Sequence, residues 1–167
     1  MKTLLLRRAR VVDPASGLDA VRDVLVEGGR VSKISARSLK REGTVVELEG
    51  LVLAPGFIDL DAHLGEPGFE WKETIASGGA AAAAGGFTAV AAMPSTDPVN
   101  DCRAVTELVT AAARKDSPVR VYPVGAVSKR MEGKELAHIG EMIEAGAVAV
   151  CDDARSVESG TLMRCAM

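Results

Sequence analysis

The sequence has no excess of basic residues and few cysteines. It contains 20 Lys and Arg against 23 Asp and Glu, a formal net charge of −3, whereas binding to a phosphate backbone normally needs a concentrated basic surface. We therefore expect no nucleic-acid partner. The three cysteines, Cys102, Cys151 and Cys165, include no CxxC pair. This argues against a disulfide scaffold or a zinc knuckle and favours reduced thiols in a cytoplasmic protein.

The sequence also lacks a recognisable signal peptide or membrane span. The opening residues, MKTLLLRRAR, place two arginines directly after three leucines and offer no small-residue cleavage site. Residues 74–96 carry no charge, but this stretch contains four glycines and one proline and is rich in alanine rather than in Leu or Ile. It predicts a helix followed by a buried strand, and no contact with a membrane.

Two regions with different patterns follow each other along the chain. Residues 1–53 contain short β-branched runs separated by turn residues, which predicts a small β domain. Residues 54–167 alternate between strand-like and helix-like segments, a pattern typical of βα units in a parallel sheet. The expected strands are 56–60, 87–92, 119–124 and 147–150, and the expected helices are 71–84, 101–115, 135–145 and one starting at 157.

Polar residues that could carry chemistry follow three of these strands. They lie in the segments GFIDLDAHLGEPG (56–68), MPSTDPVND (93–101) and CDDARSV (151–157). In βα folds the reactive groups gather at the carboxyl ends of the strands, where the loops leave the sheet. We therefore expect these three segments to form one site.

The same segments resemble those of the cyclic amidohydrolases, and within that family the dihydroorotases. The resemblance rests on the strings APGFIDL, H-L-x-EPG, ETIxxGxxAAAAGGFT, MPxTxPVND and VRVYPVGA, and on CDD followed by LMR. It implies an α/β fold in which residues 54–167 form the first half, βα units 1–4, of a TIM-type (β/α)₈ barrel. The β domain, 1–53, would be sandwich-like, with closing strands expected C-terminal of this chain. The resemblance also implies metal ions, zinc among them, that activate water for attack on a cyclic amide.

The sequence departs from the family pattern where the chemistry is carried. After the first barrel strand the family has His-x-His-x-Arg, whereas this sequence has Asp61, His63 and Gly65. A substrate-binding Asn of the family is replaced by Ser95. Gly65 lacks the guanidinium group with which the family arginine binds a carboxylate of the substrate. The loss of such a contact costs on the order of 3 kcal/mol or more. Gly65 and Ser95 therefore mark substrate-binding positions that have lost their function.

A degenerate metal site is the second expectation from the resemblance. His63 is retained, and Asp61 still offers an oxygen in place of the imidazole nitrogen of the family. Asp153 matches a carboxylate that some dihydroorotases use as a metal ligand, while its neighbour Asp152 competes as a helix N-cap or turn acceptor. We expect zinc to bind weakly or not at all, and we assign no catalytic residue.

Three other side chains have no expected part in the chemistry. His138 is expected on the third helix as a surface or packing residue. Phe69 and Trp71 are expected to pack under the loop that follows the first barrel strand.

Two hypotheses for the function remain. In the first, the chain is a catalytically inactive dihydroorotase homologue that acts as a structural partner of aspartate carbamoyltransferase in pyrimidine biosynthesis. In the second, it is a metal-dependent cyclic amidohydrolase with an altered metal site at Asp61, His63 and Asp153. A complete barrel needs about 250 residues, so residues 54–167 amount to nearly half of one, and the chain could be part of a longer or cleaved polypeptide. Four parallel strands leave two open sheet edges, and we therefore expect an oligomer or a partner.

Overall fold

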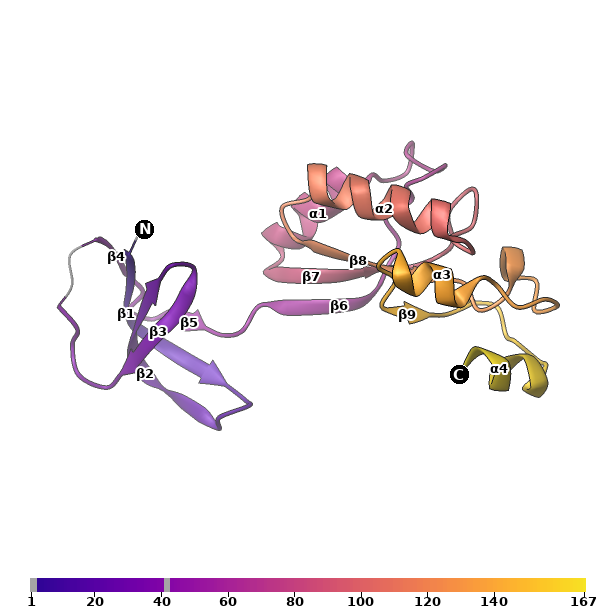
Figure 1. Ribbon diagram of the computed structural model, residues 1–167. Helices are drawn as coiled ribbons and strands as arrows, with labels where there is room; N and C mark the ends of the chain where they lie inside the picture. The colour runs from indigo at the N-terminus through magenta and orange to yellow at the C-terminus, as the bar shows by residue number, and fades with distance from the viewer. Residues whose placement is uncertain (1–2, 41–42) are drawn as a thin grey trace. The chain divides into compact units, whose positions relative to one another are not determined.

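The computed structural model describes residues 3–40 and 43–167 (Figure 1). The chain forms two compact units that divide between Pro55 and Gly56. The first unit is built of strands, and the second alternates strands and helices. The fold class expected from the sequence is therefore confirmed: a β unit followed by a parallel half-barrel of βα units. No helix in these two described stretches is both long and apolar enough to cross a lipid bilayer.

The first unit is one mixed sheet with the strand order β3-β2-β1-β4, and β5 also pairs with β1. β1 and β2 are antiparallel, whereas β4 and β5 run parallel to β1. Its core is formed by Ala9, Val11 and Val24. The closing strands expected from outside this chain stay a prediction. The strands are β1 (Thr3–Asp13), β2 (Leu18–Glu27), β3 (Arg30–Ser35), β4 (Thr44–Glu47) and β5 (Val52–Leu53).

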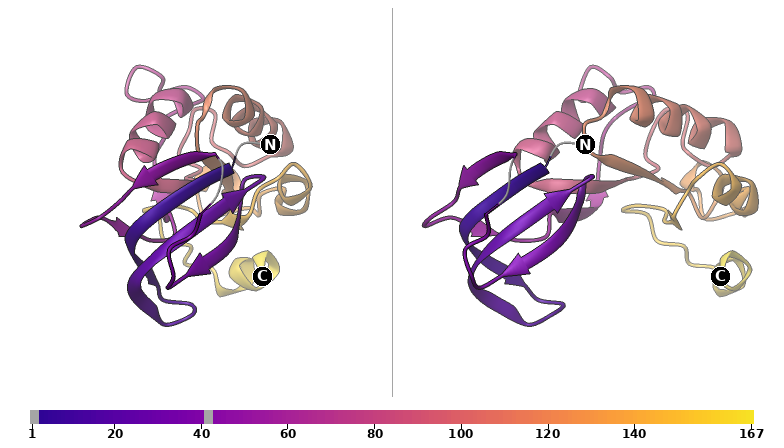
Figure 2. Two further views of the ribbon diagram at one scale, coloured as in Figure 1. Left: turned by 90° about the vertical axis from the view of Figure 1, so that its left-hand side faces the viewer. Right: turned by 60° about the vertical axis from the view of Figure 1, so that its left-hand side comes forward.

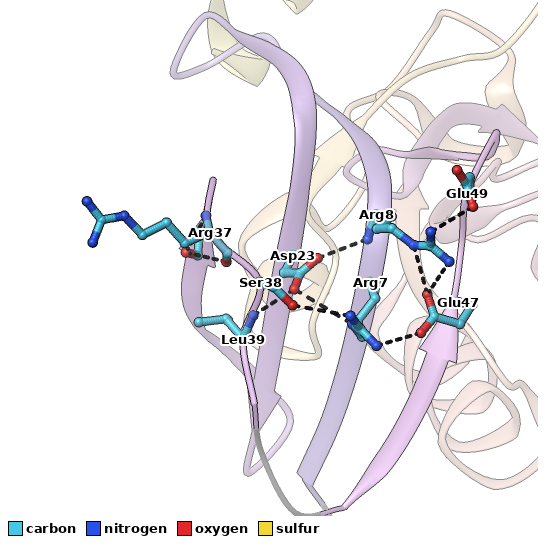
Figure 3. A network of polar contacts seen from close by, with 9 residues as sticks. Arg7, Arg8, Asp23, Arg37, Ser38, Leu39, Glu47 and Glu49 are labelled. Carbon is cyan, nitrogen blue, oxygen red and sulfur yellow. Dashed lines mark hydrogen bonds and ion pairs between the residues drawn. The ribbon is translucent and has the colours of Figure 1, made fainter.

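A bulge in β1 is held by a buried carboxylate (Figure 3). The register between β1 and β2 shifts between Leu6 and Ala9, and Arg8 has a φ of 56°. Asp23, only 5% exposed, accepts hydrogen bonds from the backbone N–H groups of Arg8 at 3.0 Å and Leu39 at 2.8 Å. At the bulge, a bond to the Asp23 side chain therefore replaces a bond of the strand ladder. The same carboxylate also ties the segment after β3 to the sheet.

The second unit contains a parallel sheet with the order β6-β7-β8-β9. Helices α1 and α2 lie side by side on one face of this sheet (Figures 1 and 2). A core that includes Leu64, Ile75, Val90 and Val109 fills the space between the two helices and the sheet. The elements are β6 (Phe57–Ala62), α1 (Ile75–Ala84), β7 (Phe87–Ala92), α2 (Arg103–Asp116), β8 (Arg120–Gly125), the 3₁₀ turn η1 (Lys129–Met131), α3 (Ile139–Glu144), β9 (Ala149–Val150) and α4 (Gly160–Ala166).

The first helix of this unit begins four residues later than the sequence indicates. Thr74 accepts a hydrogen bond from the N–H of Ser77, and the Ser77 side chain in turn accepts one from the backbone N–H of Thr74, so a capping box begins α1 at Ile75. The glycines inside α1 do not interrupt it. A Cβ on Gly79 would lie 2.3 Å from Ser117 Oγ, so this glycine lets α1 approach the end of α2 closely.

The third helix is shorter than expected, because it begins at Ile139 rather than at residue 135. The placement of His138 inside this helix was therefore wrong: it is the N-cap residue of α3. Its side chain is 53% exposed, with Nδ1 3.9 Å from Glu141 Oε1. His138 is a surface residue at a helix end.

Candidate metal centre and substrate positions

The carboxyl ends of the parallel strands bring the three sequence segments to the same edge of the sheet. Asp61 lies near the end of β6, and His63 follows directly after it. Ser95 lies in the loop after β7, and Asp153 lies in the loop after β9. Met93 N donates to Ala62 O at 2.9 Å, which holds the ends of β6 and β7 together.

Asp61, His63 and Asp153 form one group, and each offers a potential ligand atom within 4.8 Å of the other two. His63 Nε2 lies 3.0 Å from Asp153 Oδ2, and His63 Nδ1 lies 3.9 Å from Asp61 Oδ1. The side chains are 70%, 54% and 20% exposed for Asp61, His63 and Asp153. The group is therefore open to solvent on the side of Asp61 and enclosed around Asp153.

The hydrogen bond with His63 holds the pKa of the Asp153 carboxyl below its ordinary value. Partial burial acts in the opposite direction, and the Ser95 hydroxyl adds a second hydrogen bond that lowers this pKa further. Asp153 is therefore an anion at neutral pH, which is the protonation state that a metal ligand needs.

The backbone of Asp153 adopts a left-handed conformation with a φ of 53°. Its N–H donates to Cys151 Sγ at 3.2 Å. Asp and Asn tolerate this region better than most residues, and such conformations often occur at functional sites. The local chain path thus directs the Asp153 side chain toward His63.

Asp152 has a different task from its neighbour. It is 4% exposed and accepts hydrogen bonds from Val127 N at 2.8 Å, from Ser128 N at 3.0 Å and from the Ser128 hydroxyl. It is therefore a turn acceptor that anchors the loop after β8 to the loop after β9.

A buried residue that the sequence reasoning missed connects the loop after β7 to β8. Asn100 is 2% exposed; its Nδ2 donates to Val124 O at 2.9 Å, and its Oδ1 accepts from the Thr106 hydroxyl at 2.7 Å. The only signal in the sequence is its place in the string MPSTDPVND.

Gly65 occupies a position where the backbone leaves no room for a side chain. Its φ is +69°, and a Cβ built on it would lie 2.8 Å from Glu73 O and 3.0 Å from Phe69 O. The loop closes on Gly65 itself, because Phe69 N donates to Gly65 O at 2.7 Å. An arginine at this position would require the loop to change its path.

The expected burial of Trp71 was wrong. Its side chain is 79% exposed, because the turns that begin at Gly65 and Phe69 close through backbone hydrogen bonds and leave the indole outside. Phe69 is partly buried, and the Lys72 ammonium lies 4.7 Å from the Phe69 ring centre and 4.9 Å from that of Trp71. The loop thus carries a small aromatic and cationic cluster on its surface.

The second unit has the parallel arrangement of βα units found in half of a barrel, with a group of potential metal ligands at the carboxyl ends of its strands, and comparisons with known proteins narrow the class. Residues 50–167 match the family model described as "Dihydro-orotase-like". The chain is 52% identical over 165 residues to a dihydroorotase of Anaeromyxobacter sp. (strain K) and 48% identical over 166 residues to one of Syntrophus aciditrophicus (strain SB). This chain belongs to the dihydroorotase-like family.

The matches cover nearly the whole of this chain but a minor part of each relative. The alignments to these two dihydroorotases span 98% of this chain and 38% and 39% of the relatives. Among solved structures, L-hydantoinase (dihydropyrimidinase) from Arthrobacter aurescens superposes with a TM-score of 0.76 at 23% identity, over 90% of this chain and 32% of its own. A crystal structure of a dihydroorotase gives a TM-score of 0.60 at 13% identity, over 90% of this chain and 42% of its own. At these identities the superpositions show the fold alone.

Proposed function

We propose that this dihydroorotase-like protein lacks dihydroorotase activity and acts as a structural partner of aspartate carbamoyltransferase in pyrimidine biosynthesis. The observation that carries the first part is Gly65, the position where the resemblance places a substrate-binding arginine. The closed loop there has no space for a Cβ, so no side chain at this position can bind the carboxylate of an acidic cyclic ureide. Loss of such a contact costs on the order of 3 kcal/mol, about a hundredfold in affinity.

Ser95 supports the same proposal. Where the resemblance implies a substrate-binding Asn, this sequence has a serine, whose hydroxyl contributes to the lowered pKa of the Asp153 carboxyl. A hydroxyl also lacks the paired donor and acceptor of an amide. Neither position therefore carries the side chain with which the family binds its substrate.

The test of this first part is turnover of dihydroorotate by the purified protein, with and without added divalent metal. We expect none above the buffer rate. Turnover that a chelator abolishes, and that the His63→Ala variant lacks, would overturn the proposal, because the chelator shows that the activity needs a metal and the variant shows that it belongs to this chain and not to a contaminant.

The assembly role is supported by the open edge of the parallel sheet. Within the described stretches β6 pairs on one side only, and Phe57, Ile58 and Leu60 on it are 61%, 62% and 77% exposed. An apolar, unpaired edge strand is a surface that proteins normally cover. The remaining strands of a longer chain or a partner subunit would cover this edge, and we assign it to the partner subunit.

Sedimentation of the protein with the aspartate carbamoyltransferase from the same genome tests the assembly. We expect a complex heavier than either component, weakened by Leu60→Glu and unaffected by Ile143→Glu. Ile143 is a matched control, since it is an apolar side chain on α3 that is 57% exposed. Separate sedimentation of the two proteins, or equal effects of the two variants, would contradict this role.

The second candidate is a metal-dependent cyclic amidohydrolase with an altered metal site. The proximity of Asp61, His63 and Asp153 favours it, since these residues would hold a cation that lowers the pKa of bound water. This function requires bound metal in stoichiometric amount, and elemental analysis that finds none above background would remove it.

A further inference from the structure

Asp61 changes the chemistry of the donor group at the ends of β6 and β9. The group offers one imidazole, from His63, and two carboxylates, from Asp61 and Asp153. Imidazole nitrogen suits zinc, copper and nickel, whereas carboxylate and water oxygens suit manganese, magnesium and calcium. Compared with two imidazoles and one carboxylate, a donor set of two carboxylates and one imidazole therefore favours cations that prefer oxygen ligands, such as manganese.

The geometry of the group is compatible with a single divalent cation. Ligand atoms bound at about 2.1 Å lie about 3.0 Å apart when they are at right angles and about 4.2 Å apart when they are opposite. The distance from His63 Nε2 to Asp153 Oδ2 is 3.0 Å, and all three ligand atoms lie within 4.8 Å of one another. Asp61 is the most exposed of the three, so rotation of its side chain can close the remaining gap.

The charge and the surroundings of the group favour the same class of cation. The two carboxylates balance the charge of a divalent ion, and the ion-pair partner found for both of them in the described part of the chain is His63. The solvent exposure of Asp61 leaves room for water ligands, which manganese and magnesium commonly retain. The N–H of Asp153 donates to Cys151 Sγ at 3.2 Å, and its carboxylate already lies 3.0 Å from His63 Nε2, so one oxygen ligand is oriented before any cation binds.

We propose that Asp61, His63 and Asp153 hold one divalent cation and that Asp61 shifts the selectivity of this site from zinc toward manganese. Zinc still binds more tightly than manganese in absolute terms, because the general order of affinities favours it at most sites. The ratio of the two affinities is what Asp61 changes. This inference concerns binding only, so a chain without turnover can pass its test, and the proposed loss of activity does not depend on it.

The test is titration calorimetry of the whole chain with Mn²⁺ and with Zn²⁺ separately, on the wild type and on Asp61→His. The histidine variant restores a second imidazole on the same strand. We expect its preference for zinc over manganese to exceed that of the wild type by about tenfold or more. Electron paramagnetic resonance of free Mn²⁺ gives an independent measure of the manganese affinity.

Two further variants assign the binding to this group. Asp153→Asn should abolish binding of both cations, whereas Asp97→Asn, which removes an exposed carboxylate from the loop after β7, should leave both affinities unchanged. Equal selectivity of the wild type and Asp61→His would overturn the proposal. The absence of any binding by the wild type, or equal binding by Asp153→Asn, would also overturn it.

Discussion

Replacement of Asp152 by alanine should destabilise the second unit more than most single substitutions. The carboxylate is the buried acceptor of two backbone N–H groups, from Val127 and Ser128, and of the Ser128 hydroxyl. A buried donor left without an acceptor costs about 1–3 kcal/mol. Three donors lose this acceptor, and because such contributions do not add fully, we expect a loss of roughly 2–5 kcal/mol in the free energy of unfolding.

Asp152→Asn is the matched variant. Its amide oxygen can still accept from both backbone N–H groups, since a single carboxylate oxygen, Oδ1, accepts both bonds in the wild type. The amide nitrogen can donate to Ser128 Oγ. The strengthening of these bonds by the charge is lost, and the Ser128 hydroxyl, which donates to the carboxylate in the wild type, loses its acceptor, so we expect a cost of about 1–2 kcal/mol.

Urea unfolding followed by circular dichroism measures these differences in stability. Hydrogen exchange of the Val127 and Ser128 amides gives the local result, and it does not depend on whether the two units unfold together. In Asp152→Ala these amides should exchange much faster, while in Asp152→Asn they should stay protected. Stabilities of both variants within about 0.5 kcal/mol of the wild type, with unchanged exchange, would refute the reasoning.

Three further predictions concern other positions. Gly65→Ala should lower the melting temperature, because the alanine would combine a positive φ with a clash against the backbone. Gly140→Ala should raise it, because a Cβ there meets nothing within 4 Å. Equal shifts of the two variants in calorimetry would contradict the geometry. Asp23→Ala should cost roughly 2–4 kcal/mol in urea unfolding, because two backbone N–H groups lose their acceptor, and an unchanged stability would show that the bulge does not need it. Arg10→Gln should raise the pKa of Asp19, which a hydrogen bond from Arg10 lowers in the wild type. The stabilisation from Asp19 is therefore present above its ordinary pKa and lost as the pH falls through the lowered value; an unshifted midpoint in a carboxyl NMR titration would contradict this.

Much of the fold could be predicted from local patterns. The alternation of strands and helices after residue 55 depends on side-chain periodicity along short segments, which the sequence displays directly. The element ends were less accurate, because they depend on particular contacts. Thr74 ends the loop and begins α1 through its capping box. His138 stands at the N-cap position of α3, outside the helix, and its side chain makes no capping hydrogen bond.

The sequence identified the residues of the candidate site, but it did not show which role each of them has in the structure. Asp152 and Asp153 are adjacent and chemically identical, and only the structure distinguishes the buried turn acceptor from the carboxylate that faces His63. Similarly, the sequence identified Gly65 as a lost arginine position. The positive φ and the nearby backbone oxygens show that a side chain is excluded there.

The sequence by itself determined the order of the strands and helices, the family and the residue types available at the ends of the strands. These properties depend on near neighbours in the chain and on strings of residues that can be compared directly. The tertiary structure decided which of those residues meet. His63 and Asp153 are 90 positions apart, and their contact depends on the pairing of β6, β7, β8 and β9 in one parallel sheet. Asp61 and His63 are neighbours in the chain, but Asp153 reaches them only when the sheet of the second unit has formed, so the three-residue site depends on the tertiary structure.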